Sequence, residues 1–245
     1  MIIAQLSDIH ASGSKERLER LDRVLAWLRP MRPDAIIVSG DLAEDDFADS
    51  YRAVLKRLRD METLFRVVPG NVDDHGRLAD VFGPDMGWTT TRPLHSTGIV
   101  GGALRLIGLD VTVAGQHHGD AGPALDWLGA ELQRDDLPVL VFQHQHPFLC
   151  GIDGKDQNRC RGAEGLNAVL AKAGRRVLGI TCGHVHRPMF ARLGDIPASM
   201  APSVTRANRL GLDGKASDIV DPPGLLLHHV QEGRLVSHVV MAGER

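Results

Sequence analysis

The sequence predicts an α/β fold built on two packed sheets, and two observations support this prediction. Through the first two-thirds of the 245 residues, short apolar runs alternate with amphipathic helical patterns, which is typical of parallel strands covered by helices. The last third is rich in strand patterns and adds an antiparallel pair. Because no repeat, low-complexity tract or linker interrupts the chain, we expect residues 1–245 to form one domain.

The first part of the chain alternates strands and helices. After the first strand, Leu18, Leu21, Leu25 and Leu28 fall on one face of a helix that closes at Pro30. A second helix is indicated by an apolar stripe over residues 51–61. The apolar runs around these two helices predict buried strands at residues 2–6, 35–38 and 64–68.

The remainder is predicted to hold two hairpins and two further strand–helix units. One hairpin turns at Gly101-Gly102 and the other at Glu232-Gly233. Leucines at 125, 128 and 132 indicate one helix, and apolar positions at 166, 169 and 170 indicate another. The strands of this part are expected at residues 95–100, 103–109, 139–142, 177–181, 225–230 and 235–240.

The composition narrows the function classes. The formal net charge is −3 and no run of Lys or Arg occurs, so no polymeric nucleic acid is expected as a partner. No apolar stretch approaches the roughly 20 residues of a membrane span, and no signal peptide is apparent, so we expect no membrane association and a cytoplasmic location. The three cysteines are too few for a disulfide framework and are expected as free thiols. The sequence does not determine the oligomeric state, and a homo-oligomer is one of the alternatives.

Polar side chains follow five of the predicted strands at the point where each strand ends. In open α/β sheets, functional groups collect just beyond the carboxyl ends of the strands. Taken singly, these motifs are weak, since Gly-Asp and Gly-Asn are usually plain turns. Together, and in this order, they predict a shared site. The motifs are Asp8-Ile9-His10, Gly40-Asp41, Gly70-Asn71, His144-Gln145-His146 and Gly183-His184-Val185-His186.

Carboxylate, amide and imidazole donors in this mixture suit borderline divalent metals such as Mn²⁺, Fe²⁺ or Zn²⁺. We expect Asp8/His10 and His184/His186 to converge because alternate residues of an extended segment point the same way. Two ions about 3.5–4 Å apart can clamp a phosphate ester for in-line attack. The central carboxylate of Asp41 can bridge both ions.

In these motifs the chain resembles the calcineurin-like metallophosphoesterases, and most closely their bacterial class III cyclic-nucleotide phosphodiesterase branch. Further marks of that branch are Leu109-Asp110 and the loop Gly115-Gln116-His117-His118-Gly119. The resemblance covers roughly residues 1–205. It implies a four-layer α/β/β/α sandwich of two mixed sheets flanked by helices, and a hydroxide between two metal ions as the nucleophile.

Carried over residue by residue, the resemblance gives two ligand sets that share Asp41. One ion receives Asp8, His10, Asp41 and His186, and the other receives Asp41, Asn71, His144 and His184. The choice of His144 over His146 rests on aligning Pro147 with the second proline of the family's His-His-Pro-Pro pattern. Within these sets, Asp41, Asn71 and His10 are expected to act in catalysis.

The chain departs from the family pattern at Val72, where a histidine usually follows the ligand asparagine and helps to protonate the leaving group. General acid catalysis contributes about 10²–10⁴-fold. His75 or His146 could take over, the substrate could have a good leaving group, or the enzyme could be slow. The residues expected around the substrate are Asn71, His75, His117, His118 and His146.

Three function classes remain open at this point. The first is a dinuclear phosphodiesterase acting on a small diester such as a cyclic nucleotide. The second is a phosphomonoesterase or pyrophosphohydrolase on the same metal core, because fold does not determine substrate. The third is a non-catalytic protein-binding scaffold of the same fold.

The acidic run at 44–46 after Asp41 is interpreted as a solvated helix start.

Overall fold

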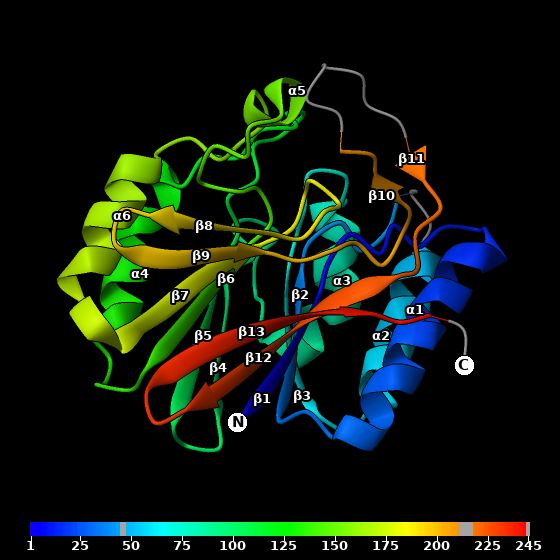
Figure 1. Cartoon of the computed structure of the whole chain (residues 1–245), viewed down its shortest axis with the longest axis horizontal. Helices are drawn as coiled ribbons and strands as arrows, with labels where there is room; N and C mark the ends of the chain where they lie inside the picture. The colour runs from blue at the N-terminus through cyan, green and yellow to red at the C-terminus, as the bar shows by residue number, and fades with distance from the viewer. Residues whose placement is uncertain (45–47, 211–217, 244–245) are drawn as a thin grey trace.

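The computed structural model describes residues 1–44, 48–210 and 218–243, and these form two sheets that pack face to face (Figure 1). The first sheet has the strand order β13-β12-β1-β2-β3, and the second has the order β4-β5-β6-β7-β9-β8. The strands of the first sheet are β1 (Ile2–Leu6), β2 (Ala35–Ser39), β3 (Leu64–Val68), β12 (Gly224–Gln231) and β13 (Arg234–Met241). Those of the second are β4 (Ser96–Val100), β5 (Leu104–Leu109), β6 (Val139–Gln143), β7 (Val177–Cys182), β8 (Met189–Leu193) and β9 (Ile196–Met200).

Helices cover the outer face of each sheet. Figure 1 shows the helices of the first half beside the first sheet and α4 and α6 beside the second. The helices are α1 (Lys15–Leu28), α2 (Ala48–Arg59), α3 (His75–Met86), α4 (Leu125–Leu132), α5 (Asp153–Asp156) and α6 (Ala163–Lys172). Three 3₁₀ helices (Arg29–Met31, Gly122–Ala124 and Gly174–Arg176) and a two-stranded ribbon of β10 (Ala207–Asn208) and β11 (Asp218–Ile219) complete the described elements.

Three apolar clusters hold these layers together. One joins the leucines of α1 to the outer face of the first sheet, and a second packs α4 and α6 on the second sheet. The third lies between the sheets, where Ile37 of β2 and Val68 of β3 share a core with Leu106 of β5 and Phe142 of β6. The predicted four-layer α/β/β/α sandwich is therefore confirmed.

Both sheets are mixed, as expected. The strands β1, β2 and β3 pair in parallel, and so do β5, β6, β7 and β9. The pairs β1–β12, β12–β13, β4–β5 and β8–β9 are antiparallel. The two predicted hairpins are confirmed, with positive φ at Gly101, Gly102, Glu232 and Gly233, a backbone conformation that suits a tight reversal between strands.

The structure differs from the sequence prediction at several elements, among them the short helix α5 and the strands β10 and β11, which were not predicted. Helix α2 ends at Arg59, so Met61 lies in the following turn rather than in the helix. Helix α3 and the β8–β9 hairpin were not predicted at all. Among the described residues, no helix is long and apolar enough to span a membrane.

Candidate metal centre

The predicted ligands lie at one edge of the sandwich, where the carboxyl ends of parallel strands from both sheets meet. Asp8 and His10 follow β1, Asp41 follows β2, and Asn71 follows β3. The second sheet contributes from β6 and β7, which are followed by His144 and by His184 and His186. All seven side chains belong to loops that leave the carboxyl end of a parallel strand, so the packing of the two sheets brings them together.

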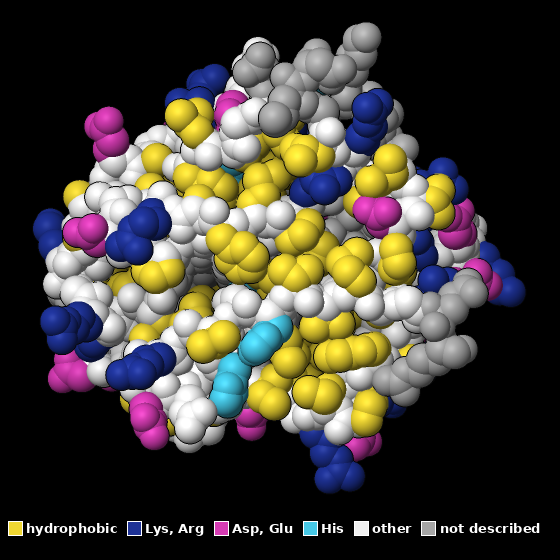
Figure 2. All heavy atoms as spheres, in the orientation of Figure 1, with side chains coloured by type: hydrophobic (Ala, Val, Ile, Leu, Met, Phe, Trp, Pro, Cys, Tyr) yellow, Lys and Arg dark blue, Asp and Glu magenta, His cyan; other side chains and the backbone are white. Residues whose placement is uncertain are grey.

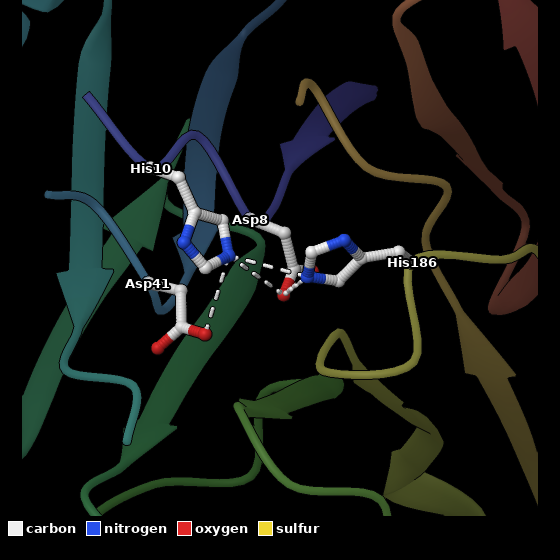
Figure 3. Close-up of side chains that lie close together, drawn as sticks. All are labelled: Asp8, His10, Asp41 and His186. Atoms are coloured by element: carbon white, nitrogen blue, oxygen red, sulfur yellow. Dashed lines mark hydrogen bonds and ion pairs between the residues drawn. The ribbon is translucent and has the colours of Figure 1, made fainter. Parts of the chain in front are cut away.

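Four of these side chains form one compact group (Figure 3). One donor atom from each of Asp8, His10, Asp41 and His186 lies within 4.8 Å of the others. The His186 Nε2 atom lies 3.1 Å from Asp8 Oδ1 and 3.2 Å from His10 Nε2. The His10 Nε2 atom lies 3.5 Å from Asp41 Oδ2. A single cation at the centre of this group would be within reach of all four side chains.

The remaining three side chains gather on the other side of Asp41. The His144 Nε2 atom lies 3.2 Å from Asp41 Oδ2, 3.1 Å from Asn71 Oδ1 and 3.3 Å from His184 Nδ1. The Asp41 Oδ2 atom thus contacts both groups, and its Oδ1 atom accepts a hydrogen bond of 3.1 Å from the Val72 N–H. Asp41 is therefore placed where a bridging carboxylate would sit.

Backbone carbonyls orient two of the imidazoles. His144 Nδ1 donates to the Ser39 carbonyl at 2.8 Å, and His186 Nδ1 donates to the Arg206 carbonyl at 3.0 Å. Each bond holds the proton on Nδ1 and leaves the lone pair of Nε2 facing the site, which is the arrangement that metal-binding histidines require. His10 differs, because its Nδ1 atom forms an ion pair with Glu44 Oε1 at 3.4 Å.

The electrostatics of the site favour bound cations. Burial alone would raise the pKa of Asp8 and of Asp41, but the neighbouring histidines lower both well below the usual range, so both remain carboxylates. Burial holds the pKa of His184 well below its usual value, so this imidazole is neutral. Its Nε2 atom is buried and has no hydrogen-bond partner among the described residues. Ionised carboxylates beside the neutral imidazole of His184 are donors that suit divalent metals.

Left-handed backbone geometry brings the ligands together. Positive φ angles occur at Asp8 (53°), His10 (49°), Asp41 (53°), His184 (77°) and His186 (59°). The expectation that Asp8/His10 and His184/His186 converge through extended alternation is therefore wrong. Each segment instead turns sharply after its strand, and Asp and His are among the residues that tolerate this region.

Glycines allow these turns to approach one another. A Cβ atom on Gly183 would lie 1.8 Å from Ser7 Oγ and 2.7 Å from Asp8 Oδ2. Gly40 has a φ of +89°, and a Cβ there would lie 2.5 Å from the ring of His144. The Gly-Asp and Gly-His motifs are thus more than turns, because their glycines make room for ligand side chains.

Comparison with known proteins agrees with this geometry. The family model of the calcineurin-like phosphoesterases matches residues 1–188. The probable glycerophosphodiester phosphodiesterase of Arcobacter nitrofigilis is 31% identical, over 100% of this chain and 94% of its own length.

The chain belongs to the calcineurin-like phosphoesterase family. It is a metal-dependent phosphoesterase. A dual-specificity cAMP/cGMP phosphodiesterase of Mycobacterium tuberculosis is 30% identical, over 99% of this chain and 80% of its own length. A dimetal phosphatase from Danio rerio shares the fold, with a TM-score of 0.75 at 14% identity over 100% of this chain and 97% of that structure.

Around this phosphoesterase centre, the structure places the predicted substrate residues unevenly. His117 lies near the site, with its Nδ1 atom 3.4 Å from Asn71 Nδ2, and the half-buried His118 follows it in the same loop. His75 is buried instead, with Nε2 contacting Asp110 and Thr112 and Nδ1 accepting from Arg92 at 3.0 Å.

His146 also lies behind the predicted metal ligands rather than among them. Its ring stacks on that of His184, with the centroids 5.8 Å apart. The structure therefore brings His144, and not His146, into contact with Asp41 and Asn71.

Sequence reasoning missed Asp73, which supports the ligand loops. Its buried carboxylate accepts hydrogen bonds from the backbone N–H groups of Leu42, Ala43 and Gly70 and from the hydroxyl of Tyr51. These bonds tie the loop after β2 to the loop after β3, and so hold Asp41 beside Asn71. The signal was visible in the sequence, because Asp73 follows Asn71 at a spacing of two in the recognised motif.

Sequence reasoning also misread Glu44. Its carboxylate contacts both His10 and Arg17, and Arg17 donates at 2.7 Å to the His10 carbonyl, so Glu44 belongs to the site rather than to a solvated helix start. The neighbouring Asp45 and Asp46 lie outside the described residues. A cavity of about 300 Å³ opens here, beside His10 and His186.

Proposed function

We propose that this phosphoesterase is a phosphodiesterase that hydrolyses small diesters, cyclic nucleotides among them, at a dinuclear centre. The observation that carries the proposal is the position of Asp41, whose Oδ2 atom contacts His10 of one ligand group and His144 of the other. Bound there, two divalent ions supply an activated water and Lewis-acid stabilisation of the phosphate. Manganese, iron and zinc all suit the donors.

The cavity beside this centre supports a small anionic substrate. Its lining includes His10 and His186, three arginines (Arg17, Arg20 and Arg206) and two carboxylates (Glu16 and Glu44). Arg20 is already committed to backbone carbonyls, and Arg17 and Arg206 pair with Glu44 and Glu16. Its volume lies near the lower end of the usual range for small-ligand sites, roughly 300–1,000 Å³. In this proposal Arg17 and Arg206 bind the charged ester, and Asn71 and His117 contact it from the opposite side.

His75 fits poorly as a replacement for the missing acid at Val72, because both of its ring nitrogens have partners. We propose that the enzyme instead relies on substrates whose leaving group needs little protonation, or turns over slowly. His118 stays a candidate for substrate contact. His146 lies behind His184 and is assigned a different role below.

The names of the relatives support the proposal that the substrate is a phosphodiester. Among them are a glycerophosphodiester phosphodiesterase and cyclic-nucleotide phosphodiesterases. A phosphomonoesterase or pyrophosphohydrolase on the same metal core is the second candidate. All seven ligand positions carry metal-binding side chains, which a protein-binding scaffold does not need. We expect polymeric nucleic acid not to be a substrate.

The decisive comparison is the turnover of bis(p-nitrophenyl) phosphate against p-nitrophenyl phosphate with Mn²⁺ added. We expect the diester to have the higher kcat/KM, and a higher value for the monoester would favour the second candidate. A panel of 3′,5′- and 2′,3′-cyclic nucleotides and glycerophosphodiesters then identifies the substrate class.

Asp41→Ala tests the bridging role. Removing the carboxylate shared by both groups should abolish turnover and lower the metal bound at this centre from two ions to one or none. Asp136→Ala changes an exposed carboxylate far from the site and is the matched control, expected to keep both properties. Unchanged activity in Asp41→Ala would remove the proposed mechanism.

Three broader proposals accompany this one. We propose a single domain, supported by the core that both sheets share. We propose a cytoplasmic location, supported by three unpaired cysteines. A homo-oligomer is supported by exposed apolar side chains at Val236, Val239 and Met241 of the edge strand β13. Figure 2 shows apolar side chains gathered on the face over β12 and β13.

A further inference from the structure

A second group of metal-binding side chains lies behind the dinuclear centre, in the segment that follows β6. It consists of His146, Cys150 and Asp156, and one donor atom from each lies within 4.8 Å of the others. The His146 Nε2 atom lies 3.7 Å from Asp156 Oδ1. Imidazole nitrogen, thiolate sulfur and carboxylate oxygen are the three donor types that proteins use for zinc.

His146 lacks the partners that a buried imidazole normally has. Its side chain is fully buried, and neither Nδ1 nor Nε2 has a hydrogen-bond partner within the described part of the chain. Buried polar atoms are nearly always satisfied, because an unpaired one costs about 1–3 kcal/mol. A cation bound to one ring nitrogen would satisfy it, and the ring already faces Cys150 and Asp156.

Asp156 holds Cys150 in place. Its Oδ1 atom accepts a hydrogen bond of 2.7 Å from the Cys150 N–H, and its Oδ2 atom accepts one of 3.0 Å from the Gly151 N–H. These bonds close the loop between residues 150 and 156 and keep the thiol near the carboxylate. Each carboxylate oxygen retains a lone pair that can bind a cation.

We propose that His146, Cys150 and Asp156 bind a third divalent cation, zinc or another thiophilic ion, separately from the dinuclear pair. Cys150 would bind as the thiolate and release its proton to solvent, so that two negative charges balance the ion. Zinc–ligand distances of about 2.0–2.3 Å require the donor atoms to move together by roughly 1 Å. The exposed segment around Gly151 can absorb this movement.

The site would fix the segment after β6 against the dinuclear centre. The His146 ring stacks on His184, a proposed ligand of that centre, and the Cys160 N–H donates to the His146 carbonyl at 2.9 Å. The third ion is thus a positioning element, and its loss need not stop binding of the other two ions.

Cobalt substitution tests the proposal through a signal that the dinuclear centre cannot give. The ligands proposed for that centre are nitrogen and oxygen donors, so a thiolate-to-cobalt charge-transfer band in the near ultraviolet reports only a cysteine ligand. We expect the band in the wild-type protein loaded with Co²⁺, its loss in Cys150→Ser, and its retention in Cys160→Ser, which changes a buried thiol of the same segment. Absence of the band in the wild type, or its persistence in Cys150→Ser, would overturn the proposal.

A labelling experiment on the wild-type protein decides the matter even if a variant fails to fold. Cys150 is half-buried while Cys160 and Cys182 are buried, so iodoacetamide should modify Cys150 first. At a zinc concentration about ten times Kd, we expect its labelling to slow about tenfold, as read from the modified peptide by mass spectrometry. An unchanged rate contradicts the site.

Asp41→Ala separates this proposal from the proposed function. In that variant the dinuclear pair is lost, yet zinc should still protect Cys150. Loss of protection in Asp41→Ala would show that the third site does not exist independently. Intact protection together with an inactive enzyme would leave both proposals standing.

Discussion

At the residue scale, the site depends on backbone conformations that most side chains avoid. Five of the seven proposed ligands have positive φ, and the loops that carry them approach so closely that a Cβ is excluded at Gly40 and Gly183. Such conformations cost of order 1–3 kcal/mol each and persist only where the surroundings enforce them. Here these conformations are enforced by the strands that precede them, β1, β2 and β7, and by hydrogen bonds between the loops, such as the one from the Asp8 N–H to the Gly40 carbonyl.

Gly183→Ala tests the close approach. The added methyl group would collide with Ser7 and displace the Asp8 carboxylate, so we expect metal affinity to fall about 10–100-fold, the usual effect of disturbing groups that orient a ligand. Gly129→Ala is the matched control, since nothing lies within 4 Å of its added Cβ in helix α4. Calorimetric titration with Mn²⁺ measures both, and equal affinities would refute the packing argument.

Val72→His tests the missing acid. Val72 is half-buried beside Asn71, at the position where the family pattern has a histidine, so we expect an imidazole there to protonate the leaving group. A positioned acid contributes about 10²–10⁴-fold, and we expect at least the lower part of this gain for alkyl esters and little for p-nitrophenyl esters. Val72→Phe is the control, because it adds an aromatic ring that cannot donate a proton. A uniform effect across leaving groups would show that protonation is not limiting.

At the element scale, α2 supports the ligand loops through one phenol. The buried Tyr51 hydroxyl donates to Asp73 at 3.1 Å and accepts from the Asp74 N–H at 2.8 Å. Asp73 in turn binds the N–H groups of both loops. The helix therefore does more than cover the sheet, because it fixes the separation of the loops that carry Asp41 and Asn71.

Tyr51→Phe removes this hydroxyl without changing the ring. The buried Asp73 carboxylate and the part-buried Asp74 N–H each lose a hydrogen bond, so we expect a loss of about 1–3 kcal/mol in the free energy of unfolding, measured by urea denaturation. Arg52→Ala, which breaks an exposed ion pair with Asp49 on the same helix, should cost less than about 1 kcal/mol. Equal losses in the two variants would argue against the Tyr51–Asp73 contact.

At the scale of the whole molecule, the stability of the metal-free protein should depend on pH through the ligand cluster. Burial lowers the pKa of His144, but the charge and hydrogen bond of Asp41 outweigh it and raise the pKa to about 9 from an ordinary 6.5. Its contribution is therefore full below pH 6.5 and is lost as pH rises toward 9. Asp8 and Asp41 have lowered pKa values, so their contribution is lost as pH falls below about 4.

We therefore expect the Tm of the metal-free protein to fall between pH 6.5 and 9, by about 2–4 °C for each kcal/mol lost. Saturating Mn²⁺ should raise Tm more at pH 9 than at pH 6.5, because metal and proton compete for the same donors. His144→Gln should weaken the pH dependence of the metal-free protein. A flat profile in the wild type would show that the cluster does not carry the expected charges.

The sequence alone predicted most strands of the two sheets. Apolar periodicity and turn residues predicted β1 to β7, β12, β13 and two hairpins, because these signals are local, but the β8–β9 hairpin and the short strands β10 and β11 were missed. Helix α3 escaped this reading, since Gly76, Gly83 and Pro84 interrupt its pattern while its Asp74 cap and its packing on α2 stabilise it. Motifs at the strand ends predicted the candidate donors, and the structure brings these side chains together.

Only the tertiary structure decided how those donors meet. Left-handed turns, rather than extended alternation, aim Asp8/His10 and His184/His186 inward, and this geometry depends on loops from two sheets locking together. The same packing sets His144 against Asp41, removes His75 from the site, and brings Glu44 to His10. It also gathers His146, Cys150 and Asp156. Each of these contacts joins residues whose neighbourhood is set by the fold, so local sequence patterns carry no record of it.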